Sequence, residues 1–128
     1  MNYSPRNGLV HYSVQSITQD SAGNLIIGTI EGLSVFDGKI FTNYTSDNGL
    51  KEDRVNSVSV LGNKVAIATE RGLYYLTDKK ITQEPDLQNE PIEKIKSIKN
   101  NFVGVSNKKV FTINNGHYEE NFSFHSKS

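Results

Sequence analysis

Apolar and polar residues alternate in short segments along most of this chain, and Gly, Asn and Asp residues separate the segments. Alternation with a period of two residues is typical of β-strands that bury one face. The first group predicts strands at 14–19, 25–29, 33–36 and 40–44, joined by turns at 20–24, 31–32 and 37–39. Gly and Asn suit such turns because they adopt a positive φ at low cost. The pattern therefore predicts a four-stranded antiparallel sheet in the first part of the chain.

The same pattern returns twice, each time about 40 residues further on. Val14-Gln15-Ser16-Ile17 returns as Val55-Asn56-Ser57-Val58 and, with more changes, as Ile95-Lys96-Ser97-Ile98. The second copy predicts strands at 55–61, 64–69, 73–76 and 80–83, and the third at 95–98, 102–105, 110–113 and 117–122. Proline at positions 85 and 91 argues against a helix between these copies, so residues 87–96 are expected to form a long connection.

Three copies of a four-strand repeat near 40 residues predict an all-β chain made of three four-stranded antiparallel blades of the propeller type. We expect one domain, 1–128, divided into blades at 14–54, 55–94 and 95–128, with residues 1–13 as a stub from a preceding repeat position. Propellers close with roughly four to eight blades, so three make a partial propeller. The open end faces predict a homodimer or contact with further blades of a parent protein.

Composition excludes several classes of protein. The 128 residues include 14 basic and 14 acidic residues and no cysteine, so disulfides and thiolate metal sites are excluded and nucleic acid is not an expected partner. No apolar run is long enough to insert into a membrane, and residues 1–12 do not resemble a signal peptide. The lysines of the last copy are interpreted as a solvated strand face: Lys94, Lys96, Lys99, Lys108 and Lys109.

The sequence contains no recognisable catalytic motif. His11, His117 and His125 occupy different repeat positions and lack a second ligand at a fixed spacing, so no metal site and no cofactor are expected. The segment from Asp20 to Asn24 lacks the ligand pattern of an EF-hand, and we interpret it as a hairpin turn. These patterns favour binding over catalysis.

The candidate binding residues follow from the blade topology. The turn between the second and third strands of a blade lies on the same rim as the connection to the next blade, and rim loops on a rigid scaffold often bind ligands. The polar residues expected on that rim are Arg6, His11, Tyr12, Glu31, Asp53, Arg54, Glu70 and Arg71. We expect them to contact a small polar ligand, for example a carbohydrate.

The first copy resembles a known repeat. Asp20-Ser21-Ala22-Gly23-Asn24, Gly28-Thr29, Gly32-Leu33, Tyr44 and Asn48-Gly49-Leu50 together resemble the two-component regulator propeller repeat. The chain departs from that repeat in having Ile26 where tryptophan is common, and Ala68 in the second copy where Gly28 stands in the first. The resemblance implies a periplasmic, ligand-sensing β-propeller of the kind found in bacterial hybrid histidine kinases, without catalytic activity.

Two alternatives stay open from the residues alone. A propeller enzyme resembling streptogramin lyase would use a rim histidine with a metal ion, and His11 is the histidine that the topology puts on the rim. In the other alternative, the blades complete a larger ring as a scaffold and bind nothing small.

Overall fold

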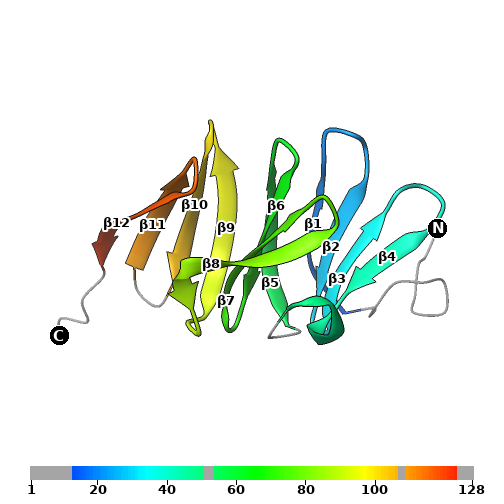
Figure 1. Ribbon diagram of the computed structural model, residues 1–128, viewed down its shortest axis with the longest axis horizontal. Coiled ribbons are helices and arrows are strands. Elements are labelled where there is room, and N and C mark those ends of the chain that lie inside the picture. The colour runs from blue at the N-terminus through cyan, green and yellow to red at the C-terminus, as the bar shows by residue number, and fades with distance from the viewer. Residues whose placement is uncertain (1–12, 51–53, 107–108, 124–128) are drawn as a thin grey trace.

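The computed structural model describes residues 13–50, 54–106 and 109–123. In this part of the chain twelve strands form three four-stranded antiparallel sheets, confirming the predicted fold class (Figure 1). Sheet 1 contains β1 (Val14–Gln19), β2 (Leu25–Thr29), β3 (Gly32–Phe36) and β4 (Phe41–Tyr44). Sheet 2 contains β5 (Val55–Leu61), β6 (Lys64–Thr69), β7 (Gly72–Thr77) and β8 (Lys80–Gln88). Sheet 3 contains β9 (Ile92–Ile98), β10 (Asn101–Ser106), β11 (Lys109–Asn114) and β12 (His117–Ser123).

The tight turns form where the sequence predicted them. Gly23 has a φ of 91° and Gly32 a φ of 137°, both in the region that other residues avoid. The Asp20 carboxylate accepts hydrogen bonds from the N–H groups of Ala22 and Asn24 at 3.0 and 2.8 Å. Asp20 therefore holds the β1–β2 hairpin closed, as expected of a turn residue.

The segment between the second and third sheets differs from the prediction. Strand β8 extends to Gln88 and β9 begins at Ile92, so the long connection expected at 87–96 is wrong, and a blade boundary at 94/95 would fall inside β9. The register of β8 against β7 shifts from Tyr74 opposite Gln83 to Gly72 opposite Gln88. The extra residues of β8 bulge out of the ladder. Pro85, which has no N–H to donate, is tolerated there because no ladder hydrogen bond is required of it.

The alignment of the third copy is also corrected. Ser16 lies opposite Gly28 and Ser57 opposite Ala68, but the residue at the same place in sheet 3 is Lys94, opposite Val105. Each sheet has its register shift at this point of the first strand. The structural equivalent of Val14-Gln15-Ser16-Ile17 is therefore 92–95, and not the sequence-matched 95–98.

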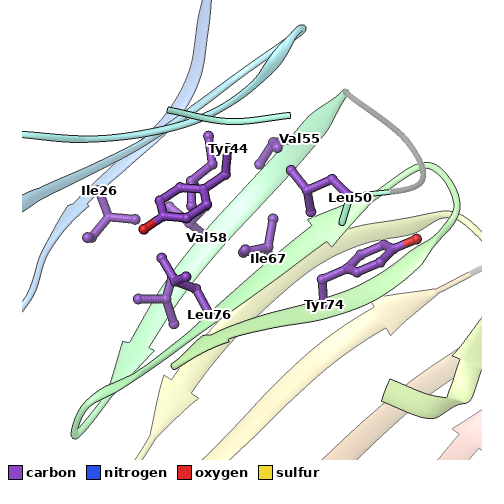
Figure 2. Close-up of a cluster of buried hydrophobic side chains, with 10 residues drawn as sticks. Ile26, Tyr44, Leu50, Val55, Val58, Ile67, Tyr74 and Leu76 are labelled. Carbon is purple, nitrogen blue, oxygen red and sulfur yellow. The ribbon is translucent and has the colours of Figure 1, made fainter. Parts of the chain in front are cut away.

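Apolar side chains fill the space between sheets 1 and 2 (Figure 2). Leu33, Leu50 and Val55 are completely buried there, and Tyr44 and Leu76 pack beside them. Burial of each such aliphatic side chain contributes roughly 1.5–3 kcal/mol to folding. Leu50 reaches this core from the short 3-10 helix η2 (Ser46–Asn48), which Gly49 ends with a φ of 112°.

A second core joins sheets 2 and 3. Its buried members from sheet 2 include Ala66, Leu73 and Leu87, which pack against Ile92 and Phe111 among others from sheet 3. Because strand residues alternate between faces, the residues next to these in sequence point away from the core. We call the face of sheets 1 and 2 that is directed toward the next sheet in chain order the forward face, and the opposite face the back face. In sheet 3 the back face packs against sheet 2, and the forward face is the one on the other side.

The first strands of the three sheets lie next to one another along one side, which we call the inner edge. The Val58 N–H donates to Ser16 Oγ at 3.2 Å across the first seam, and the Ile95 N–H donates to Ser57 Oγ at 3.2 Å across the second. This arrangement is that of blades packed around an axis. No helix in the described ranges is long and apolar enough to cross a membrane.

Candidate functional site

Two rims bound the three sheets (Figure 1). The hairpin rim contains the β1–β2, β3–β4, β5–β6, β7–β8, β9–β10 and β11–β12 turns. The connection rim contains the β2–β3 and β6–β7 turns and the links from β4 to β5 and from β8 to β9. The predicted ligand-binding residues within the described ranges belong to the connection rim.

Two equivalent turns present charged side chains on the connection rim. Thr29 Oγ1 accepts the Glu31 N–H at 3.0 Å and donates to the Gly32 carbonyl at 3.0 Å. Thr69 Oγ1 repeats both bonds in sheet 2, to the Arg71 N–H and to the Gly72 carbonyl. Both threonines are completely buried, so each turn is rigidly attached to its sheet. Glu31 and Arg71 thus occupy equivalent, exposed positions with opposite charges.

Glu70 is held near the inner edge. Asn56 Nδ2 donates to Glu70 Oε2 at 2.7 Å and to the Ile92 carbonyl at 3.0 Å, so the same amide links the β6–β7 turn to the start of β9. The turn has a further support, because the Arg71 carbonyl accepts the Gln83 side-chain amide at 3.2 Å and the Asn89 N–H at 3.3 Å. These bonds give the rim of sheet 2 a defined geometry without a ligand.

Sequence reasoning missed a charged pair on this rim in sheet 3. Ser106, which takes the place of Thr29 and Thr69, donates to Glu90 Oε2 at 2.7 Å, and Lys109 Nζ lies 3.1 Å from the same oxygen. Burial, the largest single influence, lowers the pKa of Lys109, but the hydrogen bond and charge of Glu90, together with the charges of Tyr118 and Glu120, outweigh it, so the pKa of Lys109 lies above its usual value. The prediction of a solvated face is therefore wrong for Lys109, and the sequence signal for its pairing was the serine at the threonine position.

Half of the predicted site residues can be placed. Glu31, Arg54, Glu70 and Arg71 are all exposed on the connection rim. The others, Arg6, His11, Tyr12 and Asp53, lie outside the described residues. Two carboxylates and two guanidinium groups are therefore exposed on the connection rim of sheets 1 and 2. These can donate to and accept from hydroxyl groups, and the arginines can also bind anions.

Grooves of the described surface open on the opposite, hairpin rim. A groove of about 470 Å³ opens between sheets 1 and 2 at the hairpin rim, with Tyr44 and Leu76 on its floor and Asp20, Asp37 and Lys79 around its mouth. Asp37 stabilises its own turn, because the Ile40 and Lys39 N–H groups bind its carboxylate and lower its pKa. A second groove, of about 550 Å³, lies at the same rim between sheets 2 and 3.

A third groove, of about 370 Å³, follows the inner edge and is polar. Ser16, Thr18, Ser57 and Ser59 contribute hydroxyl groups to it, and Lys94 and Lys96 contribute ammonium groups. Among the described residues no group of three or more His, Asp or Glu side chains is placed to hold a metal ion.

Comparisons with known proteins show the fold. No family model matches the sequence, and no curated protein matches it significantly. The extracellular domain of BT3049 from B. thetaiotaomicron, described as a hybrid two component system, superposes with a TM-score of 0.78 at 22% identity. That of BT4673 from the same organism, also described as a hybrid two component system, superposes with a TM-score of 0.76 at 17% identity. YCF48 bound to D1 peptide superposes with a TM-score of 0.63 at 20% identity.

The matched chains are much longer than this one. The alignment covers 96% of this chain but 20% of the BT3049 domain, and 97% of this chain but 18% of the BT4673 domain. With YCF48 it covers 84% of this chain and 40% of the other. The three sheets thus have the fold of one part of the extracellular domains of two-component systems, in line with the propeller resemblance of the sequence.

Proposed function

We propose that this chain is a noncatalytic sensing segment of a β-propeller and binds a small polar ligand at its connection rim. The observation that carries the proposal is the pair of equivalent turns at Thr29–Gly32 and Thr69–Gly72, which present Glu31 and Arg71 from rigid supports. A binding site gains affinity when its polar groups are already ordered in the free protein.

The chemistry of the rim favours a ligand rich in hydroxyl groups. Carboxylates accept hydrogen bonds from hydroxyls, and a guanidinium group donates to hydroxyl or carboxylate oxygens with a planar fork. Carbohydrates, including those with an acidic group, have this chemistry. The likeness to extracellular domains of two-component systems supports a sensing role and a periplasmic or extracellular location.

Contact with further blades is part of the proposal. Both end sheets have a face that no described sheet covers, and a second copy or blades of a parent protein would cover them. The scaffold alternative differs only in lacking the ligand, so binding decides between the two.

Isothermal titration calorimetry with glucose, N-acetylglucosamine, glucuronic acid and their short oligomers tests this function. For a sugar that binds, Arg54→Ala or Arg71→Ala is expected to weaken the affinity about tenfold, the effect of losing a charged hydrogen bond. Lys39→Ala, an exposed change on the hairpin rim, serves as the control and is expected to have no effect. Equal losses for Arg71→Ala and Lys39→Ala would contradict the rim site, and absence of binding across the panel would support the scaffold alternative.

A further inference from the structure

The two seams between the sheets depend on small residues at one place on the forward faces of sheets 1 and 2. In sheet 1 this place is the cross-strand pair of Ser16 and Gly28, and in sheet 2 it is the pair of Ser57 and Ala68. In sheet 3 the same place is occupied by Lys94 and Val105. A small pair is thus replaced by a large one on the forward face that no described sheet covers.

The serines have a specific task in the two internal seams. Ser16 Oγ accepts the Val58 N–H, while Ser57 Oγ accepts the Ile95 N–H and donates to the Ile95 carbonyl at 3.3 Å. An ammonium group cannot accept a hydrogen bond, so Lys94 cannot receive the equivalent N–H of a next strand. The inner-edge contact of the first two seams cannot form at sheet 3.

The second member of the pair controls how closely the sheets approach. A Cβ atom added to Gly28 would lie 2.6 Å from Val55 Cγ1, so the first strand of sheet 2 rests directly on the glycine. Ala68 is completely buried at the same place in the second seam. The branched side chain of Val105 would occupy the space into which an equivalent strand has to fit.

The rest of this face can still bind a partner. Val103, Val105 and Val110 point to the forward face and are partly exposed, and Ile98 is 51% exposed. Lys96 takes the place of Thr18 and Ser59, so both lysines stand at the inner edge beside an apolar strip, and both are exposed. An apolar strip with two cations at one side fits a surface of matching charge.

We propose that the forward face of sheet 3 docks a propeller-type sheet with carboxylates facing Lys94 and Lys96, and discriminates against an identical copy of this chain. Of the two partners considered above, this favours further blades of another sequence. The inference rests on the fold and is independent of ligand binding at the connection rim.

The chain itself provides a probe. In a head-to-tail contact between two copies, Lys94 would face Ile17, as Ser16 faces Val58 and Ser57 faces Ile95. Ile17 is 58% exposed, so Ile17→Glu supplies a carboxylate without disturbing a core, and Ile17→Gln is the matched neutral control. Lys94→Ser with Val105→Ala instead restores the small pair of the internal seams.

Sedimentation equilibrium of these variants tests the proposal. We expect Ile17→Glu to self-associate with a Kd about tenfold lower than that of Ile17→Gln in about 0.01 M salt, and the difference to vanish in about 1 M salt. The Lys94→Ser, Val105→Ala chain is expected to associate more tightly than the wild type at both salt concentrations. Equal association of Ile17→Glu and Ile17→Gln, or a wild type that associates as tightly as the restored seam, would overturn the proposal.

Discussion

Ser57 Oγ bonds to both the N–H and the carbonyl of Ile95, at 3.2 and 3.3 Å, and so connects the first strands of sheets 2 and 3. Ser57 is 7% exposed and Ile95 is 2% exposed, so water cannot replace these bonds easily. At the equivalent place in the first seam, Ser16 Oγ accepts the Val58 N–H and joins sheets 1 and 2. One hydroxyl in each seam thus determines how neighbouring sheets meet at the inner edge.

Removing the hydroxyl is therefore costly in the second seam. Ser57→Ala leaves two buried backbone groups without a partner, and we expect the free energy of unfolding to fall by about 2 kcal/mol. Ser97→Ala is the matched control, because Ser97 aligns with Ser57 in sequence but not in the seam. Urea unfolding measures both changes. Equal losses would show that the sequence alignment, and not the strand register, identifies the seam residues.

The close approach at Gly72 predicts a second effect on stability. Gly72 has a φ of 118°, and an added Cβ atom would lie 2.4 Å from the Leu87 carbonyl oxygen. We expect Gly72→Ala to lower the unfolding free energy by about 2 kcal/mol or more. Gly38 has a φ of 103°, but an added Cβ atom would meet no other atom within 4 Å. Thermal unfolding of Gly38→Ala should therefore show a smaller loss of unfolding free energy, about 1 kcal/mol. A Gly38→Ala loss as large as that of Gly72→Ala would contradict the contact.

Most of the sheets could be predicted from local patterns, because each blade repeats the same alternation of apolar and polar residues, separated by turn residues such as Gly, Asn and Asp. The third blade was misaligned because the chain from Gly72 to Ile92 is three residues shorter than that from Gly32 to Val55, while Ser97 matches the repeat in sequence but not in register. The rim contact between Asn56 and Glu70 could not be predicted, since it depends on β5 packing against β9. Tertiary packing, which no local pattern encodes, decides both.

A buried pair in sheet 2 predicts a dependence of stability on pH. The Tyr75 hydroxyl donates to Glu84 Oε1 at 2.6 Å, and Glu84 is 3% exposed. Burial, together with the Glu84 carboxylate, raises the pKa of Tyr75 well above its usual value of 10.0. The folded state therefore keeps the proton that the unfolded state releases, so this contribution is complete below pH 10 and decreases above it.

Urea unfolding of the wild type and of Tyr75→Phe between pH 8 and 11 measures this contribution. At pH 8 we expect Tyr75→Phe to be about 2 kcal/mol less stable, because the buried Oε1 of Glu84 loses its donor. Above pH 10 the wild type is expected to lose up to about 1.4 kcal/mol per pH unit relative to the variant. A constant difference across this range would contradict the assigned proton.

The central claim is that the connection rim is a ligand-binding surface, and an NMR titration of the 15N-labelled chain with the sugars of the calorimetric panel tests it most directly. We predict saturable shifts of the amide signals of residues 29–32, 54–56 and 69–72, whose turns carry Glu31, Arg54, Glu70 and Arg71. The hairpin-rim signals of residues 20–24, 37–40 and 62–63 should stay unchanged. Saturable shifts confined to the hairpin rim, where the groove between sheets 1 and 2 opens, would contradict the account.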